Sequence, residues 1–208
     1  MPRIAPLPVS EATDKAEQTY GRIQEMFGDQ TIPEPFLYYG RVPAFLQDFY
    51  MNFKRFVRGE GKLSPQRRAV IALAVSAHFR CQLWTDYFVE YCRDVGLEES
   101  TVAEVFAVAA TNNMYNAFFK FRDISGSSIF EGMSVGLRAH TFANTSLDEA
   151  TVELLNIAIS DLNACKPCTS GHVQAVRDMG VSDDEILEAI QCAATMAAGA
   201  HFLNSIDA

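Results

Sequence analysis

The sequence contains an internal repeat, and this repeat limits the possible folds more than any other feature of the chain. When the sequence is aligned with itself at an offset of 84 residues, residues 63–119 match residues 147–203 without a gap. Fourteen of the 57 aligned positions are identical, and apolar positions such as Val75 and Ile159 also correspond. A duplication of this length predicts two copies of one supersecondary unit that share a core.

Each copy is expected to form three helices. Ser64 predicts the start of the first helix in copy one, and the pattern Ser146-x-x-Glu149 predicts a capping box in copy two. The second helix carries a cysteine and ends at Gly96 or Gly180, since glycine is common just after a helix end. The third helix is rich in alanine, which suits close packing of helices.

The segments outside the repeat complete an all-α fold. Residues 10–27 and 43–58 have helical periodicity, and no segment alternates polar and apolar residues with period two. We expect one domain over residues 1–208, with a duplicated three-helix repeat and extra N-terminal helices. The proline-rich segments 1–9 and 28–43 are expected to be irregular, and the linker between the copies to be mostly loop with one short helix. The linker comprises residues 122–146.

Composition and charge exclude several classes of function. A formal net charge of −9 without a basic stripe argues against nucleic-acid binding. No apolar stretch is expected to be long enough to span a membrane, and the N-terminal sequence lacks the apolar region of a signal peptide. Five cysteines do not resemble a secreted disulfide framework. We therefore expect a cytoplasmic protein that binds neither nucleic acid nor membrane.

The second copy carries a group of reactive side chains around the motif Cys165-Lys166-Pro167-Cys168. Two thiols one helical turn apart lie within disulfide distance. His172 follows Cys168 by four residues, on the same helix face, and can exchange a proton with it. If the chain reverses near Asn163, Glu153 comes level with His172 in a helix hairpin. The pattern predicts a reversible dithiol redox centre with its own acid–base group.

The first copy serves as an internal control for this site. Most of its matching positions hold apolar residues, and only one cysteine is kept. The pairs are Ala69 with Glu153, Cys81 with Cys165, Trp84 with Cys168 and Phe88 with His172. The scaffold therefore does not need the polar groups for packing. This favours function for the active copy, residues 147–203, and a structural role for the degenerate copy, residues 63–119.

The spacing Glu153…Cys165-x-x-Cys168-x-x-x-His172 resembles the alkyl hydroperoxidase D-like family, within the carboxymuconolactone decarboxylase superfamily. The resemblance covers about residues 63–206, and its flanking motifs are Asn112-Asn113-Met114-Tyr115, Gly136-Leu137-Arg138 and Arg177-Asp178-Met179-Gly180-Val181. It implies a homo-oligomer, often a trimer or a trimer-based hexamer, with thiol peroxidase activity. We expect no cofactor and no metal.

The resemblance also implies a role for each site residue. Cys168 would attack the hydroperoxide, Cys165 would resolve the sulfenic acid to a disulfide, and Glu153 with His172 would relay protons. Members of the family are re-reduced by dihydrolipoamide-type dithiols and pass electrons to a peroxiredoxin partner in some cases. From the residues alone, Cys165 is a rival nucleophile, because it lies nearer the helix N-terminus and beside Lys166.

The motif departs from the family pattern at one position. The best-studied members carry a second histidine just before the second cysteine, where this chain has Pro167. A proton relay through that histidine is therefore absent. The proline before the second cysteine gives a CxPC motif, which favours disulfide exchange with a protein partner. A redox adaptor or sensor is one alternative function, and a lactone decarboxylase of the same superfamily is another, although that chemistry has no use for a cysteine pair.

Several residues have plainer interpretations. A Zn²⁺ site on Glu153, Cys165, Cys168 and His172 is a weak rival, because structural zinc sites prefer four cysteine or histidine ligands. The other three cysteines and three histidines are expected to be structural, with His201 the histidine of most interest. They are Cys81, Cys92, Cys192, His78, His140 and His201. The phenylalanine clusters at 45–56 and 118–121 are expected to be core or, as a second interpretation, a subunit interface.

Overall fold

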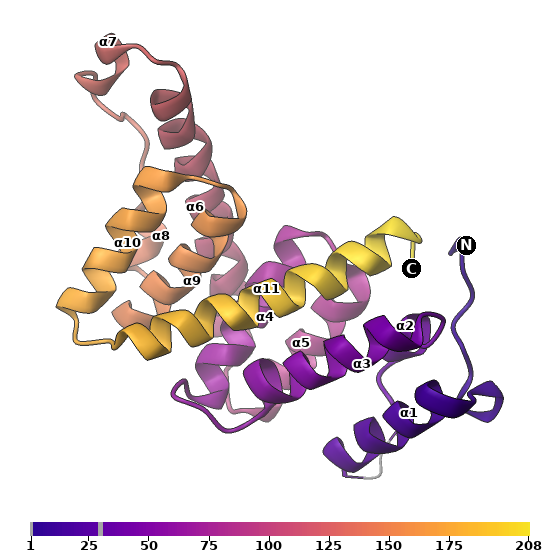
Figure 1. Ribbon diagram of the computed structural model, residues 1–208. Helices are drawn as coiled ribbons and strands as arrows, with labels where there is room; N and C mark the ends of the chain where they lie inside the picture. Colours follow the sequence, from indigo (N-terminus) through magenta and orange to yellow (C-terminus); the bar gives the residue numbers. More distant parts are fainter. Residues whose placement is uncertain (1, 29–30) are drawn as a thin grey trace.

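The computed structural model describes residues 2–28 and 31–208, and every regular element in these residues is a helix (Figure 1). The N-terminal elements are the 3₁₀ helix η1 (Val9–Glu11), α1 (Asp14–Met26), α2 (Glu34–Tyr39), α3 (Pro43–Asn52) and the π-helix η2 (Phe53–Arg58). The first copy contains α4 (Pro65–His78), α5 (Gln82–Asp94) and α6 (Glu99–Ile124). The connector holds α7 (Ser128–Glu131) and α8 (His140–Ala143), and the second copy α9 (Glu149–Leu162), α10 (Lys166–Asp178) and α11 (Asp183–Ser205). The prediction of an all-α fold is confirmed.

The two copies match helix by helix. Both ends of α4 and α5 recur 84 residues later as the ends of α9 and α10, and the starts of α6 and α11 differ by the same offset. The tight turn between the first and second helices is also repeated, since Arg80 and Ala164 have φ values of 55° and 52°. The prediction of a duplicated three-helix repeat is confirmed.

Each third helix packs on the first helices of both copies. α6 contacts α9 of the second copy as well as α4 of its own, and α11 contacts α4 of the first copy as well as α9 of its own. A glutamate on each third helix accepts a hydrogen bond from the backbone just before the other copy's first helix. Glu104 Oε2 accepts from Ser146 N at 2.7 Å, and Glu188 Oε2 accepts from Lys62 N at 2.7 Å. These two contacts, the glutamate clamps, join each copy to the other.

The N-terminal helices cover the first copy with aromatic side chains. Trp84 is fully buried, donates a hydrogen bond from Nε1 to Tyr39 Oη at 2.7 Å and packs against Phe49 and Phe53. Gly199 of α11 makes room for this cluster, because a Cβ atom there would lie 2.5 Å from the Phe49 ring. The aromatic helix predicted at 43–58 is therefore core.

Three expectations about local structure are wrong. Ser146 does not cap the first helix of the second copy, because its backbone and hydroxyl bond to Glu104 and Asp148 caps α9 instead. The segment predicted to be irregular at 28–43 contains α2, whose Pro33 and Pro35 lie at the helix start, where a free N–H is not needed; residues 29–30 lie outside the described residues. The linker holds two short helices rather than the one expected.

The expectation that no stretch reaches the length of a membrane span also needs correction. Among the described residues, α11 alone is long and apolar enough for one by length and composition, and half of its most apolar window is buried in the fold. It packs against α4, α9 and η2.

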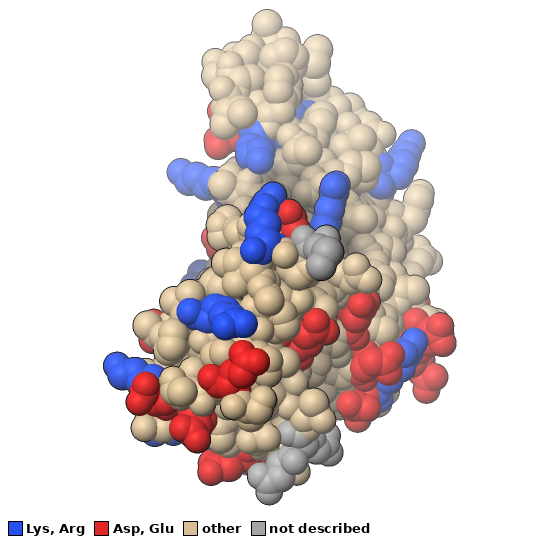
Figure 2. Space-filling view, turned by 90° about the vertical axis from the view of Figure 1, so that its right-hand side faces the viewer, with Lys and Arg blue, Asp and Glu red and all other residues tan. Residues whose placement is uncertain are grey.

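The surface is unevenly charged. Figure 2 shows one face of the molecule, with acidic side chains gathered on its lower part. The upper end of this face, where the molecule narrows, is almost uncharged. The C-terminal end of α6, together with α7, projects from the helical bundle at the top of Figure 1. This projecting end exposes four large apolar side chains, which are Phe121, Ile124, Ile129 and Met133.

Candidate functional site

The candidate site lies on the hairpin formed by α9 and α10. α9 stops at Leu162 because the chain turns through Ala164, which has a positive φ of 52°. Cys165 follows as the N-cap of α10, and its N–H bonds back to Ser160 O at 3.0 Å. The two helices run back along each other and form the most extensive helix contact in the described structure. The reversal near Asn163 is therefore where the sequence spacing requires it.

The hairpin brings Glu153 and His172 into contact. His172 Nδ1 lies 2.6 Å from Glu153 Oε2, and both side chains are about four-fifths buried, at 22% and 19% exposure. A carboxylate on one ring nitrogen fixes the orientation of the imidazole and favours the tautomer with a proton on that nitrogen. Proton exchange with other groups is then left to Nε2.

The two motif cysteines form a disulfide. Their Cα atoms are 5.4 Å apart, within the usual range for a disulfide bond. Cys165 is fully buried, whereas Cys168 is 8% exposed and lines an open cavity. The structure thus holds the oxidised form of the centre, in which the two sulfurs have unequal access to the outside.

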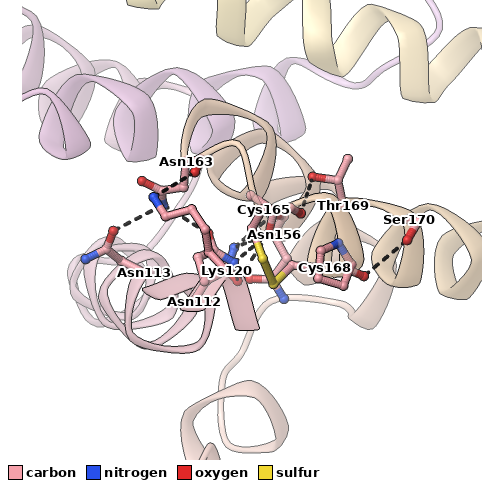
Figure 3. Close-up of a disulfide and its surroundings, with 12 residues drawn as sticks. Asn112, Asn113, Lys120, Asn156, Asn163, Cys165, Cys168, Thr169 and Ser170 are labelled. Atoms are coloured by element: carbon pink, nitrogen blue, oxygen red, sulfur yellow. Dashed lines mark hydrogen bonds between the residues drawn. A yellow bond between two sulfur atoms is a disulfide. The ribbon is translucent and has the colours of Figure 1, made fainter. Parts of the chain in front are cut away.

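A network of amide side chains supports the turn before Cys165 (Figure 3). Asn112 and Asn116 of α6 are buried and both donate to Ser160 Oγ, at 3.2 and 2.9 Å. Asn163 Nδ2 donates to Asn116 Oδ1 at 2.9 Å, and Lys120 Nζ donates to Asn163 O at 3.1 Å. The third helix of the first copy therefore holds the turn on which the second copy's cysteines depend.

Another polar residue of α9, Asn156, is fully buried. Its backbone carbonyl accepts from Asn112 Nδ2 at 2.9 Å, but neither polar atom of its side-chain amide has a hydrogen-bond partner among the described protein groups. Figure 3 includes Asn156 in the surroundings of the disulfide. The first copy has Ala72 at this position, so the amide is not needed for the scaffold.

A cavity of about 340 Å³ opens beside the disulfide. Cys168 and His172 both line it, together with Pro167 and Gly171 of α10 and with residues of α6 and the connector. The residues from α6 and the connector are Tyr115, Phe119, Ala139 and Phe142. The cavity gives a small molecule access to the sulfur of Cys168 and to the imidazole at the same time.

The remaining cysteines are unsuited to nucleophilic chemistry. Burial raises the pKa of the Cys81 thiol, and it raises the pKa of Cys92 and of Cys192 to about 12. A raised pKa disfavours the thiolate, which is the nucleophilic form of cysteine.

The other histidines lie outside the site. Burial lowers the pKa of His78, at the end of α4, while His140 and His201 are exposed. His201, the histidine of most interest in the sequence, does not line the cavity. Within the described residues, no group of three or more His, Cys, Asp or Glu side chains is arranged to hold a metal ion.

Sequence reasoning missed the supporting residues on α6 and the aromatic side of the cavity. Asn112 and Tyr115 belong to the motif Asn112-Asn113-Met114-Tyr115, but their roles depend on the packing of α6 against the second copy. One signal was present for the amides: the repeat partners of Asn112 and Asn116 are Met196 and Ala200, so polar groups replace apolar ones here as they do at the cysteines.

Comparison with known sequences identifies a family match over most of the chain. The sequence model of the Carboxymuconolactone decarboxylase family matches twice, over residues 44–124 and 131–208. Each match starts upstream of the repeat copy, so the first includes most of α3 with η2 and the second includes α8.

Curated relatives and solved structures agree with this match. The alkyl hydroperoxide reductase AhpD of Koribacter versatilis (strain Ellin345) is 29% identical over 155 residues, which cover 74% of this chain and 79% of the relative. AhpD of Anaeromyxobacter sp. (strain K) is 27% identical over 159 residues, covering 76% and 84%. A peroxidase-related protein from Ralstonia eutropha JMP134, described as an alkylhydroperoxidase AhpD core, superposes with a TM-score of 0.69 at 15% identity over 99% of this chain and 90% of that chain. The debrominase Bmp8 superposes with a TM-score of 0.65 at 15% identity, over 98% of this chain and 89% of that chain. At these sequence identities both structural similarities indicate a shared fold.

Proposed function

This chain belongs to the carboxymuconolactone decarboxylase family, and we propose that it is a thiol-dependent peroxidase that reduces hydroperoxides through a Cys165–Cys168 disulfide cycle. One observation carries the proposal: Cys168 and His172 line the same cavity, and His172 is paired with Glu153. The similarity to AhpD proteins supports the same class of chemistry.

The first step consumes the hydroperoxide. His172 takes the proton of the Cys168 thiol through Nε2, and the thiolate attacks the terminal peroxide oxygen. The O–O bond breaks, the alkoxide leaves with the electron pair, and it receives the proton from His172. The products are an alcohol and a sulfenic acid on Cys168. Glu153 stabilises the imidazolium that exists between the two proton transfers.

The second step restores the disulfide. The Cys165 thiol attacks the sulfenic sulfur, a water molecule leaves, and the Cys165–Cys168 bond forms. A dithiol of the dihydrolipoamide type then reduces this bond and becomes a disulfide itself. A peroxiredoxin is a second candidate partner, which would receive electrons from the reduced cysteine pair.

The unequal access of the two sulfurs supports Cys168 as the peroxide-reactive residue. Cys165 has the N-cap position and Lys166 beside it, but it is fully buried and does not line the cavity. A hydroperoxide that enters the cavity meets Cys168 first. Pro167 also lines the cavity, in the place of the family's second histidine, so the proton relay of this chain consists of His172 and Glu153.

The proposal extends to assembly and location. The projecting end exposes Phe121, Ile124, Ile129 and Met133, and apolar patches of this kind mark interfaces between proteins. We expect a homo-oligomer, a trimer or a hexamer, built through this end. A cycle that depends on reducing Cys165–Cys168 fits a reducing compartment such as the cytoplasm.

Peroxide consumption with dihydrolipoamide as the electron donor tests the function. The wild type is expected to consume many molecules of hydroperoxide per molecule of protein, and Cys168→Ser is expected to consume none. Cys81→Ser is the matched control, because it removes the thiol of the first copy at the repeat partner of Cys165. A redox adaptor would cycle its disulfide with a protein partner while peroxide stayed constant, and a lactone decarboxylase would keep its activity in Cys168→Ser. Either result would overturn the proposal.

A further inference from the structure

The cavity beside Cys168 has two chemically different walls. The wall from α10 carries Cys168 and His172, while the wall from α6 and α8 carries the aromatic residues Tyr115, Phe119 and Phe142. Its volume of about 340 Å³ lies at the small end of the range of about 300–1,000 Å³ for small-molecule sites. An apolar cavity of about 150 Å³ already accepts a benzene ring. The space is therefore sufficient for one ring and a short substituent.

The aromatic wall is held in a fixed arrangement. Tyr115 Oη donates to Leu137 O at 3.0 Å, so the hydroxyl is tied to the connector. The Tyr115 and Phe119 rings are near-parallel, with centroids 6.1 Å apart, and Phe142 lies 6.2 Å from Tyr115. Rings held in this way present a preformed surface for stacking or edge contact with another ring.

The first copy shows what the scaffold accepts at the equivalent place. By the repeat offset, Trp84 replaces Cys168 and Gly199 replaces Tyr115. A Cβ atom on Gly199 would lie 2.5 Å from the Phe49 ring and 2.7 Å from Tyr39 Oη, and the Phe49 ring is 5.7 Å from Trp84. Aromatic rings from the N-terminal helices therefore fill in the first copy the region that is a cavity in the second.

The charge of the lining narrows the class of ligand further. No lysine or arginine lines the cavity, and His172 is its one ionisable nitrogen base among the described residues. An anionic group would have no cation to pair with there apart from His172, which the peroxide chemistry uses.

We propose that the substrate of this chain is an uncharged hydroperoxide that bears an aromatic ring. The ring lies against Tyr115, Phe119 and Phe142, and the peroxide group points to Cys168. The proposal rests on the peroxidase function. The chemistry is unchanged: the terminal oxygen passes to Cys168 as a sulfenic acid, and the aryl-substituted alkoxide takes up a proton and leaves as an alcohol.

A comparison of three peroxides tests the substrate class. Cumene hydroperoxide, tert-butyl hydroperoxide and hydrogen peroxide are assayed with the same dithiol, and kcat/KM is expected to be at least tenfold higher for the aryl substrate than for the other two. Independently of turnover, the product alcohol 2-phenyl-2-propanol is expected to bind to Cys168→Ser at least tenfold more tightly than tert-butanol, as measured by calorimetry.

Two glycine variants make the test site-specific. A Cβ on Gly171, in α10, meets no protein atom within 4 Å, because it faces the cavity. Gly171→Leu fills that space and also improves helix propensity, so the ratio of kcat/KM for cumene hydroperoxide to that for hydrogen peroxide should fall at least tenfold in a folded protein. Gly21→Leu on α1, which likewise meets nothing within 4 Å, is the matched control and should leave the ratio unchanged.

The outcomes separate this proposal from the peroxidase proposal. Equal kcat/KM values for the three peroxides, with no preference for the aryl alcohol, would overturn the aromatic substrate while the peroxidase function stands. An unchanged ratio in Gly171→Leu would also overturn it. No turnover of any peroxide would overturn the peroxidase function, and the alcohol measurement would then decide alone whether the cavity takes an aryl ligand.

Discussion

Glu153 Oε2 lies 2.6 Å from His172 Nδ1, although 19 residues separate the two in the sequence. The contact depends on the tight turn at Ala164, whose positive φ reverses the chain between α9 and α10. The pair is only about one-fifth exposed, so its interaction is less screened by solvent than that of a surface ion pair. It is the polar contact that links the two helices of the site at the level of the cavity.

Loss of the Glu153 charge should slow peroxide turnover. In Glu153→Gln the amide can still contact His172 but no longer stabilises an imidazolium, so we expect kcat/KM to fall by about 10²-fold, the lower end of the range for acid–base groups. The pH profile of kcat/KM should change shape as well, which a merely structural defect would not cause. Asp161→Asn removes an exposed carboxylate from the same helix and should have wild-type kinetics. A wild-type pH profile in Glu153→Gln would remove Glu153 from the relay.

A sulfenic-acid probe should label Cys168 rather than Cys165. In Cys165→Ser the sulfenic acid cannot be resolved, so a single equivalent of hydroperoxide should leave a stable label on Cys168. In Cys168→Ser, Cys165 remains buried away from the cavity and should stay unlabelled. Mass spectrometry of the labelled peptide measures both. Label retained in Cys168→Ser and lost in Cys165→Ser would reverse the assignment.

The two glutamate clamps should differ in their contribution to stability. Arg68 is 3% exposed, and its Nε lies 3.4 Å from Glu188 Oε1, so Glu188→Gln leaves a buried guanidinium without its counter-charge. We expect a loss of about 3–5 kcal/mol in the free energy of unfolding, measured by urea titration. Glu104→Gln, the matched change in the first copy, leaves no buried charge and should cost much less. Equal losses would mean that the Arg68 charge is not what Glu188 stabilises.

Acid should weaken the folded state through carboxylates near the start of α9. Hydrogen bonds from the Ser146 side chain and backbone and from Thr145 lower the pKa of Glu104 below its ordinary 4.5. Burial by itself raises the pKa of Asp148, but hydrogen bonds from Thr151 and the charge of Arg67 outweigh it and lower the pKa below 3.8.

The sign of the pH effect follows from these shifts. Because both pKa values are lowered on folding, the stabilisation is complete above the unfolded values and is lost as the pH falls through the folded ones. The free energy of unfolding should therefore decrease as the pH drops below about 4.5. Urea titrations between pH 3 and pH 6 measure it, and the decrease should be shallower in Glu104→Gln. A decrease of the same steepness in that variant would contradict the role of Glu104.

Much of the fold could be predicted because the repeat offset constrains the helices of the two copies twice. The cap at Ser64 predicts the start of α4, and the same offset leads to Asp148, which caps α9. The local pattern at Ser146 suggested a different start because a serine followed by a glutamate three residues later is typical of a capping box. The structure uses Ser146 to bond Glu104 instead, a contact with a residue 42 positions earlier that no local pattern reveals.

The α9–α10 side of the candidate site was also predictable, since its four side chains lie within one hairpin of known spacing. The opposite side was not. Tyr115 and Phe119 reach the cavity because α6 crosses from the first copy to the second, and Phe142 reaches it from the short helix α8. An aromatic residue on a helix is most often core, and only the tertiary arrangement distinguishes a ring that lines a cavity from one that fills it.

The shared packing of the third helices has a consequence for the symmetry of the molecule. Each third helix packs on the first helices of both copies, so the core of each copy is completed by the other. The molecule thus has the arrangement of a pseudo-symmetric dimer within a single polypeptide. The two halves of this arrangement need not be identical, since one has Trp84 where the other has Cys168.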